Sequence, residues 1–184
     1  VLIGADDPDA MLRHTEECRQ RGYPFIADPS QQLAFSDGEL IRRLIDGAAL
    51  LFSNEYESAM IEQKTGWSAD EVLARVGTQV TTLGKDGVRI LRRGEAPIEL
   101  PAAADVTALE PTGVGDAFRA GFLAGRSLAL SFERAAQLGS LMATLTLETV
   151  GTQEYQLDTA VARVRLADAY GEDAAAEIAV ALAW

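Results

Sequence analysis

The sequence predicts an α/β fold, a mostly parallel β-sheet flanked by helices, and three observations carry this prediction. Short apolar runs alternate with longer amphipathic stretches through the first half of the 184-residue chain. Two strand-like runs in the middle flank a turn bounded by glycines. The final third reads as helical. No repeat, low-complexity run or linker interrupts this order, so we expect one domain over residues 1–184.

Three short apolar runs in the first half have the length and composition of strands. The run at 48–52 is apolar at every position, which is typical of a strand buried on both faces of a sheet. The expected strands cover residues 1–3, 23–27 and 48–52.

Helix starts in the first half are marked by capping residues. Asp7 precedes Pro8, which is favoured at the first helical position, and this helix is expected to stop at Gly22. Two pairs have the spacing of capping boxes, Ser36 with Glu39 and Ser68 with Glu71. The expected helices cover residues 8–21, 36–45, 55–66 and 68–76.

The second half is expected to contain a hairpin followed by helices. Residues 79–83 and 88–91 flank the glycine-bounded turn, and residues 98–100 extend the hairpin. A strand at 106–109 is expected to lead into a second glycine turn. The helices that follow are expected to start at Asp116, Ser131, Asp158 and Glu172.

Composition excludes several classes of function. A net charge of −12 argues against binding to nucleic acid or to anionic membranes. No apolar run approaches the ~20 residues of a membrane span, and no signal peptide is visible. The single cysteine, Cys18, suits a reducing compartment, so we expect a cytoplasmic location.

Residues 110–118, Glu-Pro-Thr-Gly-Val-Gly-Asp-Ala-Phe, carry the strongest functional signal. Gly113 and Gly115 allow a tight turn and a close approach of the backbone to a ligand. The amides of such a turn and the N-terminus of the following helix form an anion site. Asp116 beside that site would repel an anion, which favours a chemical role, such as accepting the proton of a hydroxyl that attacks a phosphoryl group. The structural alternative for Asp116 is a carboxylate that interacts with the helix dipole.

Two common glycine-rich nucleotide motifs do not fit this chain. The dinucleotide fingerprint Gly-x-Gly-x-x-Gly would need a third glycine at Phe118. The P-loop pattern around Gly84 and Lys85 fails at both ends, with Gln79 in place of the first glycine and Asp86 in place of serine or threonine.

Two further motifs follow predicted strands. Asn54 and Glu57 come directly after the buried strand, and ligands of open α/β sheets bind at the carboxyl ends of strands. A helix N-cap and a first-turn acid are the structural alternatives for these two residues. Thr82, Gly84 and Gly87 lie at the hairpin turn, and a plain turn is the alternative there.

Together these motifs resemble those of the ribokinase-like (PfkB) carbohydrate kinase family. Residues 110–116 are similar to its signature Asp-Thr-x-Gly-Ala-Gly-Asp, with Glu110 and Val114 among the departures. Residues 54–57 fit Asn-x-x-Glu, and residues 82–87 fit Thr-x-Gly-x-x-Gly. The phrases that resemble the adenosine kinase branch of this family in actinobacteria are those at residues 28–32, 113–122 and 151–154.

The resemblance implies a ribokinase-like three-layer fold, of which this chain would be the ATP-binding, catalytic C-terminal portion. The chain begins at Val1 in an apparent mid-strand position, and its first methionine is Met11, so we expect a longer gene product. The N-terminal half, with the lid and most substrate-binding residues, would then be absent. The implied reaction is transfer of the γ-phosphoryl group of ATP to a primary hydroxyl with Mg²⁺. Adenosine, giving AMP in purine salvage, is the favoured acceptor, and the complete protein is expected to form a homodimer.

The resemblance also implies roles for individual residues. Asp116 would be the general base, and the amides of Gly113, Val114 and Gly115 would stabilise the transferring phosphoryl group. Val114 replaces the usual alanine, which leaves its backbone amide unchanged.

The cofactor residues follow in the same way. Asn54 and Glu57 would hold Mg²⁺ and phosphate oxygens. Some family members hold an activating monovalent cation, such as K⁺, near a loop like that around Gly151, and Glu110 replaces their usual aspartate in that site. The residues implied in ATP binding are Asn54, Thr82, Gly84, Gly87, Thr112 and Gly151.

Three alternatives remain open from the sequence. A sugar kinase acting on ribose, fructose or a related compound would differ in residues outside this chain. A catalytically incomplete fragment would bind a nucleotide, or pair with another chain, without turnover. A nicotinamide-dinucleotide module is disfavoured by Phe118.

Overall fold

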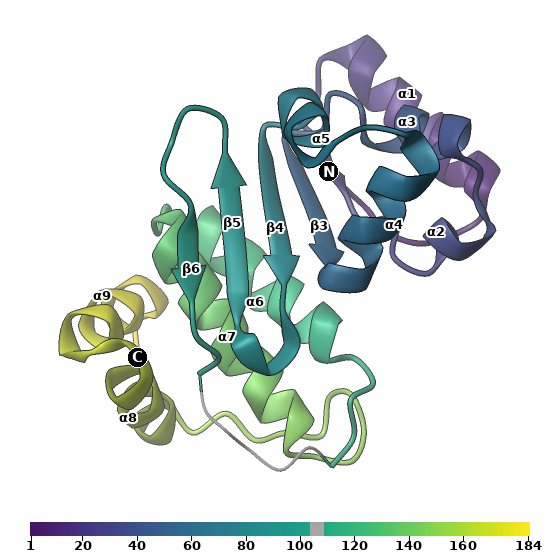
Figure 1. Cartoon of the computed structure of the whole chain (residues 1–184). Coiled ribbons are helices and arrows are strands. Elements are labelled where there is room, and N and C mark those ends of the chain that lie inside the picture. Colours follow the sequence, from purple (N-terminus) through teal and green to yellow (C-terminus); the bar gives the residue numbers. More distant parts are fainter. Residues whose placement is uncertain (104–108) are drawn as a thin grey trace. The chain divides into compact units, whose positions relative to one another are not determined.

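The computed structural model describes residues 1–103 and 109–184 (Figure 1). The chain forms two compact units. The first unit comprises Val1–Leu83 and Arg89–Ile98. The second unit comprises Gly84–Val88 and Glu99–Trp184. Three residues of the strand expected at 106–109 lie outside the described part of the chain.

Among the residues that the structure describes, six strands form one sheet in the order β1-β2-β3-β4-β5-β6. The pairs β1–β2, β2–β3 and β3–β4 are parallel, and β5 runs opposite to β4 (Figure 1). The prediction of an α/β fold with a mostly parallel sheet is thereby confirmed. The strands are β1 (Leu2–Ile3), β2 (Ile26–Ala27), β3 (Leu50–Asn54), β4 (Thr78–Thr82), β5 (Val88–Arg92) and β6 (Ile98–Leu100).

The core of the first unit forms where helices meet one face of the parallel strands. Ile3, Ala27 and Leu51 are aligned in register, and all three are buried in one apolar cluster with residues of the surrounding helices. Among these helices, α1 packs on β1 and α3, while α4 packs on α3, β3 and β4. The helices are α1 (Pro8–Arg21), α2 (Gln32–Phe35), α3 (Gly38–Ile45), α4 (Glu55–Thr65) and α5 (Ala69–Arg75).

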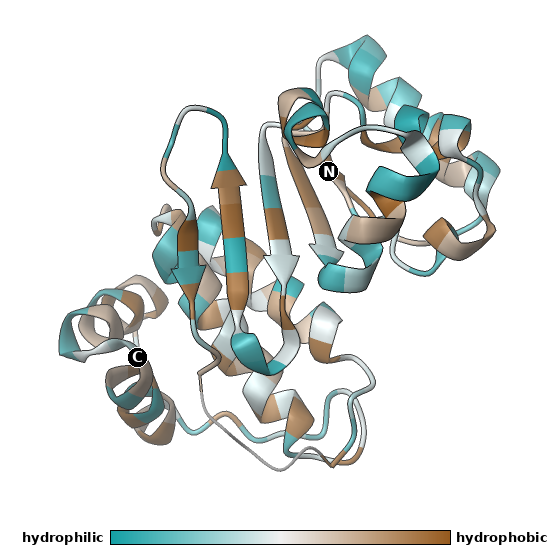
Figure 2. Cartoon of the chain, in the orientation of Figure 1, coloured by the Kyte–Doolittle hydropathy of each residue, from teal (hydrophilic) through white to brown (hydrophobic). Residues whose placement is uncertain are grey.

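Strand β3 is buried on both faces, as predicted from its composition. Leu50, Leu51 and Phe52 are consecutive in the strand, so they alternate between faces, and all three are buried. Figure 2 shows the strand as mainly apolar. It carries Asn54 at its carboxyl end.

The helix caps show which local predictions were correct. Asp7 accepts a hydrogen bond from the Ala10 amide at 3.0 Å, and α1 ends at Gly22 in the left-handed conformation. Ser68 and Glu71 form the predicted capping box of α5.

The capping box predicted for Ser36 and Glu39 is wrong. Asp37 is the N-cap of α3, and its Oδ1 accepts the Leu40 amide at 2.8 Å. Ser36 ends α2 and is buried, and its carbonyl accepts a hydrogen bond from the Lys64 ammonium at 2.9 Å. Serine and aspartate are both good N-caps, so the local sequence does not decide between Ser36 and Asp37. The tertiary contacts of Ser36 decide it.

The second unit is built on a close pair of helices, α6 and α7. A Cβ added to Gly121 would lie 2.8 Å from Met142 Cγ and 2.9 Å from Gly139 Cα. A Cβ added to Gly125 would lie 3.0 Å from Ala135 Cα. Glycines therefore allow the two backbones to approach. The helices of this unit are α6 (Val114–Ser127), α7 (Phe132–Leu147), α8 (Thr159–Tyr170) and α9 (Glu172–Leu182).

Helices α8 and α9 complete the second core by packing on α7 and on each other. Leu141 and Leu145 of α7, Leu166 of α8 and Ile178 of α9 are buried in one cluster. Among the residues that the structure describes, no helix is long and apolar enough to cross a membrane.

Candidate active site

The glycine turn at the start of α6 is fixed by a backbone conformation that favours glycine. Gly113 is the N-cap of α6 with φ of 80°, in the left-handed region. A Cβ there would lie 2.8 Å from Cγ2 and 2.9 Å from Cβ of Thr152. The helix begins at Val114, two residues before the predicted start at Asp116. Gly113 forms the turn, and Val114 and Gly115 already belong to the helix.

The N-terminus of α6 presents unpaired amides. The Val114 amide donates to the Pro111 carbonyl at 3.3 Å, and the Ala117 amide donates to the Gly113 carbonyl at 2.9 Å. Within the described residues, the amides between them, those of Gly115 and Asp116, have no backbone acceptor. Such amides and the helix dipole attract an anion.

Asp116 is the third residue of α6, and its side chain is 85% exposed. One carboxylate oxygen, Oδ1, lies 3.3 Å from Nη1 of Arg119, whose side chain is only 15% exposed. The carboxylate is therefore accessible to a substrate and is contacted by a largely buried cation. Arg119 was not among the predicted site residues, although an acid and a base three residues apart on a helix is a recognisable signal.

The Glu110 carboxylate is hydrogen-bonded to Thr112, the residue directly before the glycine turn. Its Oε1 accepts the Thr112 hydroxyl at 2.6 Å and the Thr112 amide at 3.2 Å. These hydrogen bonds hold the pKa of Glu110 below its ordinary value. The monovalent cation implied by the resemblance would share this carboxylate, and one of its two oxygens is already engaged with Thr112.

The loop around Gly151 lies against the glycine turn within the second unit. Gly151 has φ of 100°, and its carbonyl accepts the Thr149 hydroxyl at 3.4 Å. Thr152 is the residue that a side chain at Gly113 would strike. The structure thus brings together the segments of Gly113 and Gly151.

In the first unit, Asn54 and Glu57 form a reciprocal capping box at the start of α4. Asn54 Oδ1 accepts the Glu57 amide at 2.8 Å, and Glu57 Oε2 accepts the Asn54 amide at 2.8 Å. Both residues therefore have the structural roles that the sequence offered as alternatives, Asn54 as a helix N-cap and Glu57 as a first-turn acid. Glu57 Oε1 lies outside the box, and one carboxylate oxygen fits Mg²⁺, which keeps several waters and takes few protein ligands.

Asn54 is paired in register with Thr82 at the carboxyl ends of β3 and β4. Beneath them the hydroxyls of Ser53 and Thr81 are buried and 3.4 Å apart. The two predicted residues, Asn54 and Thr82, therefore lie side by side within the first unit. Among the described residues, no group of three or more histidine, cysteine, aspartate or glutamate side chains could hold a metal ion.

The two glycines after β4 differ in their surroundings. They bound the short 3₁₀ turn η1 (Gly84–Asp86), with φ of 60° at Gly84 and 96° at Gly87. A Cβ on Gly87 would lie 1.9 Å from the Leu100 carbonyl oxygen, whereas a Cβ on Gly84 would meet nothing within 4 Å. Packing thus requires a glycine at position 87, whereas no neighbouring atom crowds position 84.

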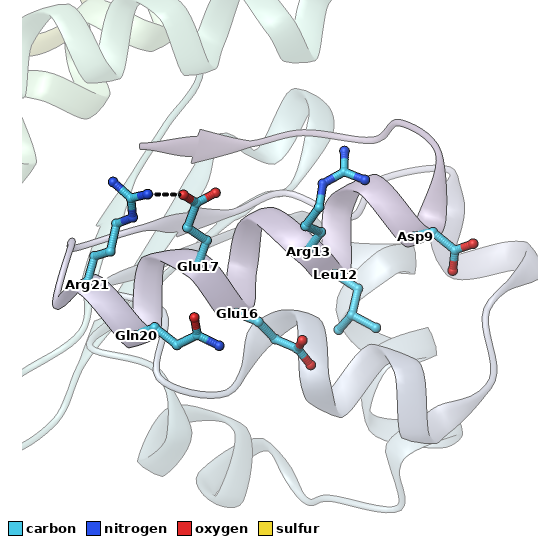
Figure 3. Close-up of a pocket in the computed structure, with 7 residues that line it drawn as sticks. All are labelled: Asp9, Leu12, Arg13, Glu16, Glu17, Gln20 and Arg21. Carbon is cyan, nitrogen blue, oxygen red and sulfur yellow. Dashed lines mark ion pairs between the residues drawn. The ribbon is translucent and has the colours of Figure 1, made fainter.

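A hollow beside α1 contains none of the predicted site residues (Figure 3). Its lining comes entirely from that one helix, and it contains the ion pair between Glu17 and Arg21 at 2.7 Å. With no second element supplying polar groups, we assign it no chemistry. The lining residues are Asp9, Leu12, Arg13, Glu16, Glu17, Gln20 and Arg21.

The chain matches the pfkB family of carbohydrate kinases over residues 2–160. The match covers most of the chain, including every predicted site residue, so this protein belongs to that family. The resemblance inferred from the motifs is confirmed.

Curated relatives include nucleoside kinases. The nucleoside kinase of Methanocaldococcus jannaschii is 28% identical over 156 residues, which cover 83% of this chain and 50% of that protein. The nucleoside kinase of Methanothermobacter thermautotrophicus is 28% identical over 172 residues, which cover 93% of this chain and 55% of that protein. The chain thus spans about half the length of these relatives.

Solved structures give the same result. Burkholderia thailandensis nucleoside kinase in complex with inosine has a TM-score of 0.86 and 38% identity, covering 92% of this chain and 57% of that one. The same kinase has also been solved in complex with ADP-inosine. Arabidopsis thaliana ribokinase, at 19% identity and a TM-score of 0.69, shows the shared ribokinase-like fold alone.

Proposed function

We propose that this chain supplies the ATP-binding and catalytic part of a nucleoside kinase that transfers the γ-phosphoryl group of ATP to a primary hydroxyl. One observation carries the proposal. The exposed carboxylate of Asp116 stands beside unpaired amides at the N-terminus of α6, directly after the left-handed Gly113 turn. Those amides can donate hydrogen bonds to a phosphoryl group, and the carboxylate can accept a proton.

In the proposed mechanism, Asp116 accepts the proton of the acceptor hydroxyl as its oxygen attacks the γ-phosphorus. The new oxygen–phosphorus bond forms as the bond to the β-phosphate oxygen breaks, and ADP leaves. The amides of Gly115 and Asp116 donate hydrogen bonds to the phosphoryl oxygens, where charge is spread in the transition state. Val114 is a weaker donor here than expected, because its amide already contacts Pro111.

The metal proposed for this reaction is Mg²⁺, with Glu57 Oε1 as the protein oxygen and Asn54 beside it. When bound, Mg²⁺ neutralises charge on the β- and γ-phosphates. The capping box fixes the Glu57 carboxylate through the Asn54 amide, so the remaining oxygen has a defined place at the end of β3. Thr82 adds a neighbouring hydroxyl at the end of β4.

We propose a purine nucleoside as the acceptor, with adenosine favoured and AMP as the product. Support comes from the 38% identity to a nucleoside kinase solved with inosine, and from the phrases that resemble adenosine kinases. Purine salvage in the cytoplasm is the setting that this substrate implies.

The same-class alternative is a sugar kinase. It is favoured by the family description and by an uncharacterised sugar kinase of Archaeoglobus fulgidus, which is 25% identical over 154 residues. The transfer chemistry at Asp116 is the same for both acceptors, so the substrate separates them.

The test offers Mg·ATP to the chain with adenosine, inosine, ribose or fructose separately and measures ADP release, with the product mass determined. ADP and a nucleoside monophosphate formed only with a nucleoside support the proposal. ADP formed only with ribose or fructose would replace it by the sugar kinase. Binding of Mg·ATP without ADP release from any acceptor would contradict it.

A further inference from the structure

The side chain of Arg119 folds back over the start of its own helix. Its Nη1 lies 3.3 Å from Asp116 Oδ1, one turn earlier in α6. The guanidinium is largely buried, with 15% of the Arg119 side chain exposed against 85% for Asp116. A buried, planar cation thus contacts an otherwise exposed carboxylate.

Gly115 lies beneath this guanidinium. A Cβ built on Gly115 would lie 2.8 Å from Arg119 Nη1 and 3.7 Å from its Cζ. Gly115 is within α6 and is not among the glycines with positive φ, so its backbone conformation does not require a glycine. What Gly115 provides is space.

We propose that Arg119 is a positioning residue that holds the Asp116 carboxylate, and that Gly115 is a glycine so that the Arg119 guanidinium can reach it. The inference rests on the proposed function, in which Asp116 accepts a proton. It deepens that function by assigning a task to Arg119, to which the sequence motifs gave no role, and a separate task to each of Gly113 and Gly115.

An exposed aspartate samples several rotamers, and only some aim a carboxylate oxygen at a reacting hydroxyl. A guanidinium fork that is already packed in place selects one of them at little further cost in entropy. It also places a positive charge beside the Asp116 carboxylate. This charge reduces the repulsion between that carboxylate and a phosphoryl anion, in a chain whose net charge is −12.

The geometry makes an unusual prediction for Gly115→Ala. The atom that a methyl group would strike is the flexible end of a side chain, so the helix can stay intact while the guanidinium moves away. Gly115→Ala should therefore have the same effect as Arg119→Met, and the double variant should be no worse than either single variant. If Gly115 instead lets the phosphoryl group approach, the two losses multiply.

The first test needs no turnover. In the wild-type chain, the side-chain NMR signals of Arg119 should show the slowed guanidinium rotation of a paired arginine. Asp116→Asn and Gly115→Ala should each change the Arg119 guanidinium signals, while Gly4→Ala, where a methyl group meets nothing within 4 Å, should leave them as in the wild type. Arg119 signals unchanged in both variants would overturn the proposal, whether or not the chain is a kinase.

The second test is kinetic. Arg119→Met and Gly115→Ala should each lower kcat by about 10- to 100-fold, with KM for ATP and the melting temperature nearly unchanged. Arg119→Lys should restore part of the loss, and Arg163→Met, which removes an exposed arginine from α8, should cause none. Multiplicative losses in the double variant, or a fall in stability that accounts for them, would overturn the proposal. Normal turnover in Asp116→Asn would instead reject the proposed function, and the NMR result would still decide the contact.

Discussion

At the scale of single residues, two glycines one residue apart meet different physical needs. Gly113 adopts a positive φ and lies against Thr152, so both its backbone and its missing side chain matter. Gly115 has neither constraint and lies only under a movable guanidinium. A motif written as Gly-x-Gly conceals this difference, which appears only when the neighbours of each glycine are known.

This difference predicts opposite effects on stability. Gly113→Ala should lower the free energy of unfolding by about 1–3 kcal/mol, because it combines a left-handed backbone with a steric clash. Gly115→Ala should cause no such loss, because alanine is the better helix former. Urea unfolding of both variants checks this, and equal losses would show that both glycines are needed for the backbone.

Glu57 has a structural and a proposed chemical task, and a matched control separates them. Glu57→Gln weakens the capping box of α4 and should also raise the Mg²⁺ concentration needed for half-maximal ATP binding. Glu71→Gln weakens the equivalent box of α5, where no metal is proposed, and should leave the Mg²⁺ titration unchanged. Identical Mg²⁺ titrations for both variants and the wild type would remove Glu57 from the metal site.

At the scale of elements, helix starts and stops were mostly predictable because caps act locally. Asp7, Ser68, Ser131 and Asp158 all cap the helices that the sequence assigned to them. The Ser36 prediction failed because Lys64, far along the chain, engages the neighbouring carbonyls. The short helix α2 (Gln32–Phe35) has too few residues to show a periodic pattern, so the sequence did not reveal it.

The contact of α6 with α7 depends on the absence of a side chain at Gly121. Gly121→Val should force the helices apart and lower the free energy of unfolding by about 1–3 kcal/mol or more. Ala124→Val adds bulk to an exposed position of the same helix and should cost far less. Thermal unfolding of the two variants checks this, and equal losses would point to valine's helix propensity rather than to packing.

The ion pair between Arg134 of α7 and Glu177 of α9 should make stability depend on pH. The hydrogen bond from Arg134, 2.8 Å long at Nε, holds the pKa of Glu177 below its ordinary value. A lowered folded-state pKa contributes stability above the unfolded pKa of about 4.3, and this is lost as pH falls through the folded value.

Glu177→Gln should therefore be less stable than the wild type at pH 7, and the difference should shrink as the pH falls below the unfolded pKa of about 4.3 and vanish below the folded-state pKa. Asp168→Asn, which removes an exposed acid from α8 outside this pair, controls for net charge. A Glu177→Gln difference that stays constant from pH 7 to pH 3 would show that the ion pair does not carry the effect.

At the scale of the whole molecule, the sequence was sufficient for the family and fold but not for the contacts of the site. The motifs predicted Asp116 and Asn54 because their spacing relative to strands and glycines is local. They could not show that the Val114 amide donates to the Pro111 carbonyl or that the Arg119 side chain folds back onto Asp116. Those facts depend on backbone and side-chain geometry, which no residue pattern specifies.

In the proposed reaction, Asp116 accepts a proton during phosphoryl transfer from ATP to a nucleoside. The most direct measurement is nucleoside-dependent ADP release from Mg·ATP by the wild-type chain and by Asp116→Asn, with ATP affinity measured for both. We predict release by the wild type, a loss of about 100-fold or more in Asp116→Asn, and ATP affinities within about twofold of each other. Equal rates in the two proteins would remove Asp116 from the role of proton acceptor, and wild-type binding of Mg·ATP without any nucleoside-dependent ADP release would reject the proposed kinase activity.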